Sequence, residues 1–171
     1  MFELKPISKE AIPAALKKAE RYRLLNEPRE AESICRDILR TDPANQAATV
    51  MLLLAMTDQF GRGFEVELDD ARAVLPQILD SYERAYYAGV VFERWGKALL
   101  ARASPGYDWF REAMVWYERA EALSPADNND AILRWNTCAR ALMRHAEHEP
   151  PGRGVAAELG DEEEVPLLGP R

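Results

Sequence analysis

The chain of 171 residues contains only two cysteines and two histidines. Cys35 and Cys138 cannot build the disulfide framework of a small secreted domain, so we expect reduced thiols and a cytoplasmic location. A membrane-spanning helix needs about 18 consecutive apolar residues, and the longest apolar run here extends only from Val50 to Met56. The first ten residues carry mixed charge and no apolar segment, so we expect no signal peptide and no membrane association.

Sequence motifs of enzymes are scarce as well. Gly61-Arg62-Gly63 lacks the lysine and the spacing of a phosphate-binding loop, and we find no serine-centred nucleophile elbow. His145, Glu147 and His148 could place two imidazoles on one helical face, but no further ligand lies near them in the sequence. Cys138 lies about two helical turns from His145, too far along the axis for a nucleophile–base pair. We therefore expect no catalytic residue, no metal site and no cofactor.

The net charge of −7 is concentrated at the C-terminus. Residues 147–171 contain most of the excess acid, four prolines and four glycines, which indicates a disordered acidic tail after a folded domain of residues 1–146. Val165, Leu167 and Leu168 could instead form a short docking motif beside the acidic residues. The rest of the chain is nearly neutral, unlike the basic face of nucleic-acid-binding domains, so we expect no nucleic-acid partner.

A short sequence pattern occurs twice. Residues 29–31 and residues 111–113 both read Arg-Glu-Ala, and each is followed by an apolar stripe with helical spacing. The first stripe leads to Asp42-Pro43-Ala44 and the second to Ser124-Pro125-Ala126. Repetition at fixed spacing is typical of repeat proteins, in which each helical hairpin buries its apolar face against its neighbours.

Apolar positions three and four residues apart predict an all-α fold. Pro28 is well placed as the first residue of a helix, and Asp108 could cap another. Helix and turn signals together predict seven helices, with a kink or break at Pro76. The predicted helices cover approximately residues 8–25, 28–41, 46–59, 68–80, 81–103, 108–123 and 130–145.

These helical pairs resemble the tetratricopeptide repeat (TPR) family, whose repeat of about 34 residues places small side chains where helices cross. The positions that agree with the family pattern are Ala19, Tyr22, Ala31 and Pro43 in a first unit, and Gly96, Ala113, Tyr117 and Pro125 in a third. The positions that depart are Ala15, Lys18 and Cys35, with Phe92 as an aromatic in place of tryptophan. A second unit is degenerate, and the intervals between units exceed the family repeat.

The resemblance covers about residues 11–145. It implies a right-handed stack of about three and a half antiparallel helical hairpins, a TPR-like α-solenoid, with a final helix carrying Trp135 that caps the stack. In this family the first helix of each hairpin lines a concave groove that binds peptide segments. The matching positions are Leu16, Glu20, Arg23, Val50, Leu54, Thr57, Glu93, Lys97, Ile132, Asn136 and Arg140.

Among these positions we expect partner contacts from Arg23, Leu54, Thr57, Glu93, Lys97, Asn136 and Arg140. The alternative for Arg23, Lys97 and Arg140 is that they are solvated surface charges. The resulting hypothesis is a non-enzymatic protein–protein interaction module or adaptor that captures a protein or peptide segment.

Three alternatives stay open. The chain could be a small chaperone or assembly factor that shields a partner, or a metal-dependent enzyme that uses its histidines. It could also form a homodimer through Trp109 and Trp116, which lie off the main apolar stripe of the sixth predicted helix. Those two side chains could instead cover the long fifth helix.

Overall fold

The structure, a computed structural model, describes residues 2–63 and 66–148, without the side chains of Glu147 and His148. Within this part of the chain the fold is all-helical, as predicted, with no strand. The predicted disordered tail lies outside the described residues, apart from the backbone at the end of the last helix. The α-helices are α1 (Ile12–Leu24), α2 (Pro28–Thr41), α3 (Gln46–Thr57), α4 (Leu68–Arg72), α5 (Ser81–Ala101), α6 (Tyr107–Leu123) and α7 (Asp130–His148), with two 3-10 turns, η1 (Lys9–Ala11) and η2 (Leu75–Gln77).

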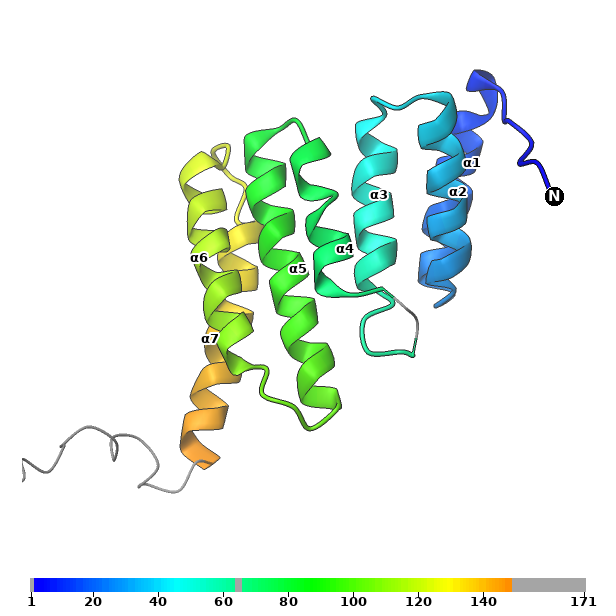
Figure 1. The fold of residues 1–171 in the computed structure, drawn as a ribbon. Coiled ribbons are helices and arrows are strands. Elements are labelled where there is room, and N and C mark those ends of the chain that lie inside the picture. The colour runs from blue at the N-terminus through cyan, green and yellow to red at the C-terminus, as the bar shows by residue number, and fades with distance from the viewer. Residues whose placement is uncertain (1, 64–65, 149–171) are drawn as a thin grey trace, which may run out of the picture.

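The helices lie side by side in a row and alternate in direction along the chain (Figure 1). α1 and α2 form one end of the row, and α6 and α7 form the other. Consecutive helices pack on each other at both ends, where α2 contacts α1 and α3, and α6 contacts α5 and α7. The middle of the row is joined more sparsely, through contacts of α3 and α4 with α5.

Local sequence signals explain most helix boundaries. α2 begins at Pro28, as predicted, directly after a turn in which Asn26 has a positive φ of 65° that asparagine tolerates better than most residues. α3 begins after Asn45, whose side chain accepts a hydrogen bond from the backbone N–H of Ala48 at 3.0 Å. The predicted cap at Asp108 is wrong, because α6 begins one residue earlier and Asp108 pairs with Arg111 inside its first turn.

The fourth helix is shorter than predicted. α4 ends at Arg72, and the 3-10 turn η2 follows after a short turn, so the break comes before Pro76 rather than at it. Proline lacks the backbone N–H and disfavours helix at the preceding residue, which explains why the helix does not resume. The apolar side chains of Val74 and Ile78 are buried and hold this segment against the core.

Small residues lie where the helices approach most closely. Ala31 and Ala113 are both fully buried, as expected for residues at helix crossings. Gly89 of α5 lies under the ring of Tyr117, and a Cβ atom at this position would come within 2.5 Å of that ring. Gly96 is packed against the backbone of Gly106 at the start of α6. The α5–α6 pair therefore depends on three glycines, Gly89, Gly96 and Gly106, of which the sequence pattern identified only Gly96.

We predict that Ala113→Arg and Ala31→Glu each lower the free energy of unfolding by about 1–3 kcal/mol or more, because no space is left for a larger side chain. Urea denaturation monitored by circular dichroism measures the effect. Ala101→Arg, at an exposed position at the end of α5, is the matched control and is expected to stay within about 0.5 kcal/mol of wild type. Wild-type stability of both crossing variants would contradict the packing described here.

Candidate functional site

The predicted groove residues lie on α1, α3, α5 and α7, but several of them bind other residues of the same chain. Arg23 pairs with Asp58 through Nε and Oδ2 at 2.7 Å, and its side chain is only 18% exposed. Thr57 is buried and donates to the carbonyl oxygen of Leu54 at 2.9 Å. Leu54 is half-buried and packs against the cluster of α5, α6 and α7. These contacts leave little of the Arg23, Leu54 and Thr57 side chains for a partner.

Asp58 joins α1 to α5 across the end of α3. Besides its pair with Arg23, it accepts a hydrogen bond from Nη1 of Arg94 on α5. The same nitrogen of Arg94 donates to Oγ1 of Thr57 at 2.7 Å and to the carbonyl oxygen of Leu54 at 3.2 Å. One carboxylate thus holds two arginines from different helices, and the sequence pattern gave no sign of Asp58 or Arg94.

Glu93 is the centre of a second group, the α5–α7 polar cluster, formed by Glu93, Lys97, Tyr117 and Arg134. The carboxylate is fully buried. It accepts a hydrogen bond from the hydroxyl of Tyr117 at 2.6 Å and from Nη1 of Arg134 at 3.2 Å. Lys97, one turn further along α5, pairs with it as well. The cluster therefore joins α5, α6 and α7 through a single buried negative charge.

The partners of Glu93 keep it ionised. Burial alone would raise the pKa of the carboxyl, because it removes water from the charged form. Hydrogen bonds from Lys97 and Tyr117, together with the charge of Arg134, outweigh burial and hold the pKa of Glu93 below its ordinary value. Burial and the adjacent Glu93 charge raise the pKa of Tyr117, so its hydroxyl remains the donor.

The predicted groove residues differ in how open the fold leaves them. Glu93 and Thr57 are buried and Arg23 is a partner of Asp58, so none of the three presents an open binding group. Of the other predicted residues, Arg140 is exposed, Lys97 is about half exposed beside Glu93, and Asn136 is half-buried. The TPR pattern marks which positions face a neighbouring helix, but it cannot tell whether the polar group there is already bound within the chain.

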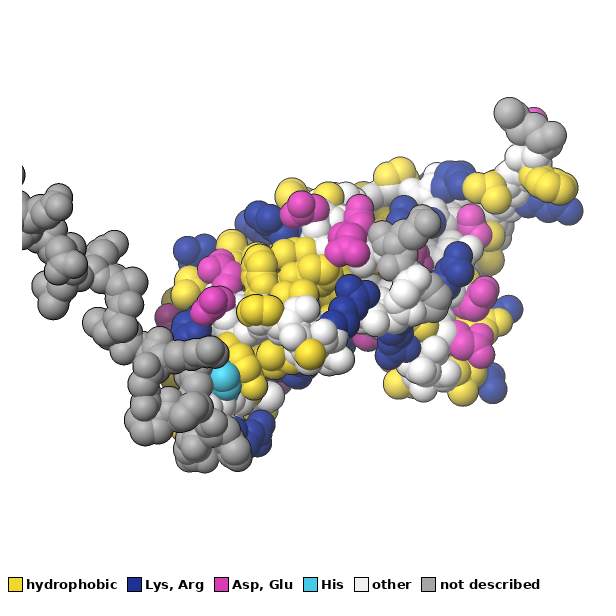
Figure 2. Space-filling model, turned by 60° about the horizontal axis from the view of Figure 1, so that its bottom comes forward, with side chains coloured by type: hydrophobic (Ala, Val, Ile, Leu, Met, Phe, Trp, Pro, Cys, Tyr) yellow, Lys and Arg dark blue, Asp and Glu magenta, His cyan; other side chains and the backbone are white. Residues whose placement is uncertain are grey.

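A different surface is open and apolar. The α4–α6 groove is a hollow of about 850 Å³ between α4, η2, α5 and α6. Figure 2 shows hydrophobic side chains gathered over α5 and its neighbours, with charged side chains around them. The apolar lining consists mainly of Leu75, Ala85, Ala88, Phe92, Trp116 and Leu123, and three arginines, Arg72, Arg84 and Arg119, complete it.

Aromatic rings form one wall of the α4–α6 groove. Phe92 stacks between Trp109, at a centroid distance of 5.8 Å, and Trp116, at 6.5 Å. Both tryptophans are half-buried and cover α5, which is one of the two roles predicted for them. Trp116 also donates its indole N–H to Glu112 at 3.0 Å. The wall is therefore rigid and apolar, with its polar nitrogen already satisfied.

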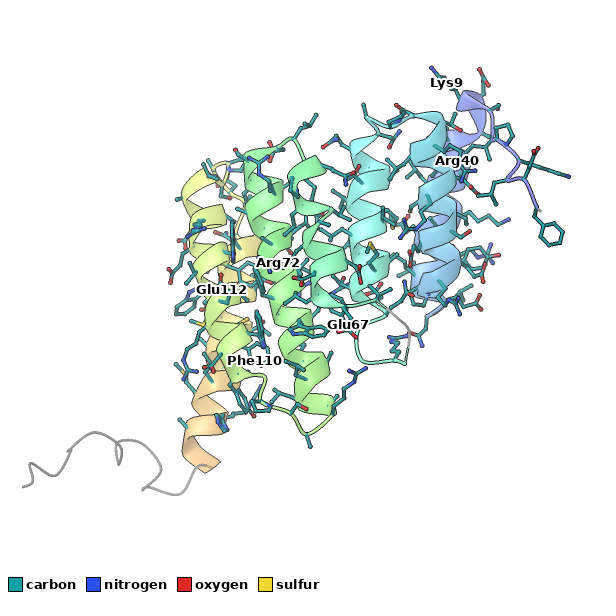
Figure 3. The ribbon with its side chains drawn as sticks, viewed as in Figure 1. Lys9, Arg40, Glu67, Arg72, Phe110 and Glu112 are labelled. Atoms are coloured by element: carbon teal, nitrogen blue, oxygen red, sulfur yellow. The ribbon has the colours of Figure 1, made fainter. Side chains whose placement is uncertain are left out.

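The three arginines are held near this wall. The guanidinium of Arg119 lies 4.5 Å from the ring centroid of Trp116, and that of Arg72 lies 6.0 Å from Phe92. Arg72 reaches from the end of α4 over α5, and Glu112 lies on the neighbouring α6 (Figure 3). Arg84 donates to the carbonyl oxygen of Ile78 at 2.8 Å. None of the described residues that line the groove is acidic, so its charge is positive.

The groove is a consequence of the short fourth helix. Ala85 and Ala88 give α5 a flat face one turn apart, and α4 ends at Arg72 before it can cover that face. The signals were present in the sequence as Pro76 and the two alanines. Pro76 and the two alanines line a groove only because the tertiary structure brings α6 alongside α5. α6 adds Trp116 and Arg119, which lie one turn apart on its surface.

Cys35, Cys138 and His145 are each engaged within the fold. Burial raises the pKa of both the Cys35 and the Cys138 thiol to about 12, so neither supplies a thiolate near neutral pH. The His145 ring stacks on Tyr107 with centroids 3.6 Å apart. In residues 2–63 and 66–148 no group of three or more metal-ligating side chains comes together. None of the helices in that part of the chain combines the length and apolar character needed to cross a membrane.

We predict that Glu93→Ala lowers the free energy of unfolding by about 3–5 kcal/mol, because it leaves Arg134 partly buried without its counter-charge. Urea denaturation of the two proteins measures the difference. Glu121→Ala, at an exposed position of α6, is the control and is expected to change stability by no more than about 0.5 kcal/mol. A Glu93→Ala variant as stable as this control would show that the polar cluster does not hold the helices.

The lowered pKa of Glu93 also predicts a pH dependence. Its folded-state pKa lies below the unfolded value of about 4.3, so the stability from ionised Glu93 is complete above that value and is lost as the pH falls through the lower folded-state pKa. The difference in free energy of unfolding between wild type and Glu93→Gln is therefore expected to be constant from about pH 7 to pH 5 and to shrink below about pH 4. A difference that widens on acidification would contradict the lowered pKa.

Two surfaces thus stand out in the described part of the chain. The predicted groove residues near Asp58 and in the α5–α7 polar cluster are occupied largely by the protein's own ion pairs. The α4–α6 groove instead combines apolar walls with arginines. None of the protein families, curated proteins or solved structures compared with this chain matches it.

Proposed function

We propose that this chain is a non-enzymatic protein–protein interaction module built as a TPR-like stack of about three and a half helical hairpins. The alternating direction of neighbouring helices supports the stack (Figure 1). So does the burial of small residues at positions of the family pattern, Ala19, Ala31, Gly96 and Ala113. The module binds a segment of another protein and carries out no bond chemistry.

The observation that carries this proposal is the α4–α6 groove. An apolar wall of Phe92 and Trp116 beside Arg72, Arg84 and Arg119 combines the residue types that contribute most to protein recognition, namely aromatic side chains and arginine. The hollow of about 850 Å³ can accommodate several side chains of a bound segment. We therefore place the binding face at this groove rather than on the face of Glu93.

The nature of the lining favours a particular class of partner. Three cationic groups without an acidic lining residue attract carboxylates, and the apolar walls require aliphatic or aromatic side chains. The nearly neutral charge of the folded part favours a protein partner over a nucleic acid. A peptide segment with acidic and apolar residues meets both requirements.

We predict that peptides selected from a random library on the full chain are enriched in acidic and apolar residues and bind the α4–α6 groove. Arg119→Glu/Leu123→Ser is expected to weaken their binding at least tenfold, because it reverses one cation and removes one apolar contact. Isothermal titration calorimetry measures the dissociation constants.

The matched control is Arg21→Glu/Leu25→Ser at the C-terminal end of α1, which makes the same two exchanges at exposed residues with the same spacing. It is expected to bind the selected peptides like wild type. Failure to enrich any peptide, or equal loss in both double variants, would overturn the proposed function. Sedimentation velocity of the wild-type chain distinguishes capture of a partner from self-association, for which the mass would rise with concentration.

A further inference from the structure

We infer that the α4–α6 groove is occupied in the free protein by residues 161–168 of the same chain, as a tethered ligand that a partner must displace. This inference rests on the proposed function of the groove. The segment reads Asp-Glu-Glu-Glu-Val-Pro-Leu-Leu and lies outside the described residues. The chemistry of the groove and the reach of the chain both support this assignment.

Charge complementarity is the first support. Four consecutive acidic residues begin the segment, and the groove presents Arg72, Arg84 and Arg119 without an acidic lining residue. Carboxylate–guanidinium hydrogen bonds are among the strongest that side chains make. No other run of four acidic residues occurs anywhere in the sequence, so residues 161–164 are the best-matched anionic segment of the chain.

Apolar complementarity between the segment and the groove is the second support. Val165, Leu167 and Leu168 follow the acidic residues directly. The groove places its apolar wall of Phe92 and Trp116 next to its arginines, so a segment can meet both in a few residues. A purely acidic segment would leave that wall in water, and a purely apolar one would leave the guanidinium groups without counter-charges.

The reach of the chain is the third support. His145 near the end of α7 stacks on Tyr107, the first residue of α6. Arg119 lies about 18 Å further along α6 at the rise of an α-helix. Residues 149–160 can span about 40 Å when extended, which is enough to follow α6 and cross to its α5 side. The acidic segment then arrives at the groove.

A competing basic surface lies further away. Lys17, Lys18 and Arg21 line a smaller hollow of about 480 Å³ on α1. α1 stands at the opposite end of the row from α7 (Figure 1). Its lining contains one aromatic residue, Tyr22, and lacks the stacked rings of the α4–α6 groove. Distance and composition therefore both favour the groove beside α6.

Two of the groove arginines, Arg72 and Arg119, are available for such an exchange. Arg72 pairs with Asp69 at 3.1 Å, but both side chains are more than half exposed, and exposed pairs of this kind contribute little. Arg119 contacts the face of Trp116, which leaves the edge of its guanidinium for a carboxylate. Docking of residues 161–164 can therefore replace weak local contacts by charge-assisted hydrogen bonds.

A labelled synthetic peptide of residues 158–170 tests the inference against the full chain. We expect it to bind Glu162→Lys/Glu163→Lys/Glu164→Lys at least tenfold more tightly than wild type, because the tethered copy no longer competes at its high effective concentration. Adding Arg119→Glu/Leu123→Ser to that variant is expected to abolish binding, and adding Arg21→Glu/Leu25→Ser to leave it unchanged. Fluorescence anisotropy measures each dissociation constant.

The outcomes separate this inference from the proposed function. Equal affinity of the peptide for wild type and the triple variant, while library-selected peptides still bind the groove, would overturn the tethered ligand alone. If neither the peptide nor the selected peptides bind, the proposed function fails with it. A wild-type mass that rises with concentration and returns to the monomer in the triple variant would place the segment in the groove of a second copy, which overturns the intramolecular form.

Discussion

The buried charge of Glu93 is the constraint on which the end of this structure around α5, α6 and α7 depends. A fully buried carboxylate is stable only when its neighbours compensate it, and here Tyr117 of α6 and Arg134 of α7 do so. Tyr117 reaches the carboxylate by packing its ring directly against Gly89, which lies one turn before Glu93 on α5. The close approach of the helices and the ion cluster are therefore two aspects of one packing arrangement.

This arrangement also decides which surface remains open. α5 uses one side for Glu93, Arg94 and their partners, and its other side carries Ala85, Ala88 and Phe92. Because α4 stops at Arg72, that second side is only partly covered, and α6 adds Trp116 and Arg119 to it. The α4–α6 groove thus results from a shortened helix rather than from an added element.

The sequence predicted the all-helical fold and most helix boundaries, since helical periodicity and turn residues such as Pro28 act locally. It also placed Ala31 and Ala113 at buried positions. It did not predict the early end of α4, which depends on how Val74 and Ile78 reach the core. Nor did it predict the partners of Glu93, because Tyr117 and Arg134 lie on two other helices and a one-dimensional pattern cannot pair them.

The most direct test of the account is to map a bound library-selected peptide on the full chain by backbone amide chemical shifts. We expect the largest changes on residues 72–92 and 116–123, which contain the lining of the α4–α6 groove. Changes concentrated instead around Lys97, Asn136 and Arg140 would contradict it and would return the binding face to the surface that the repeat pattern alone implied.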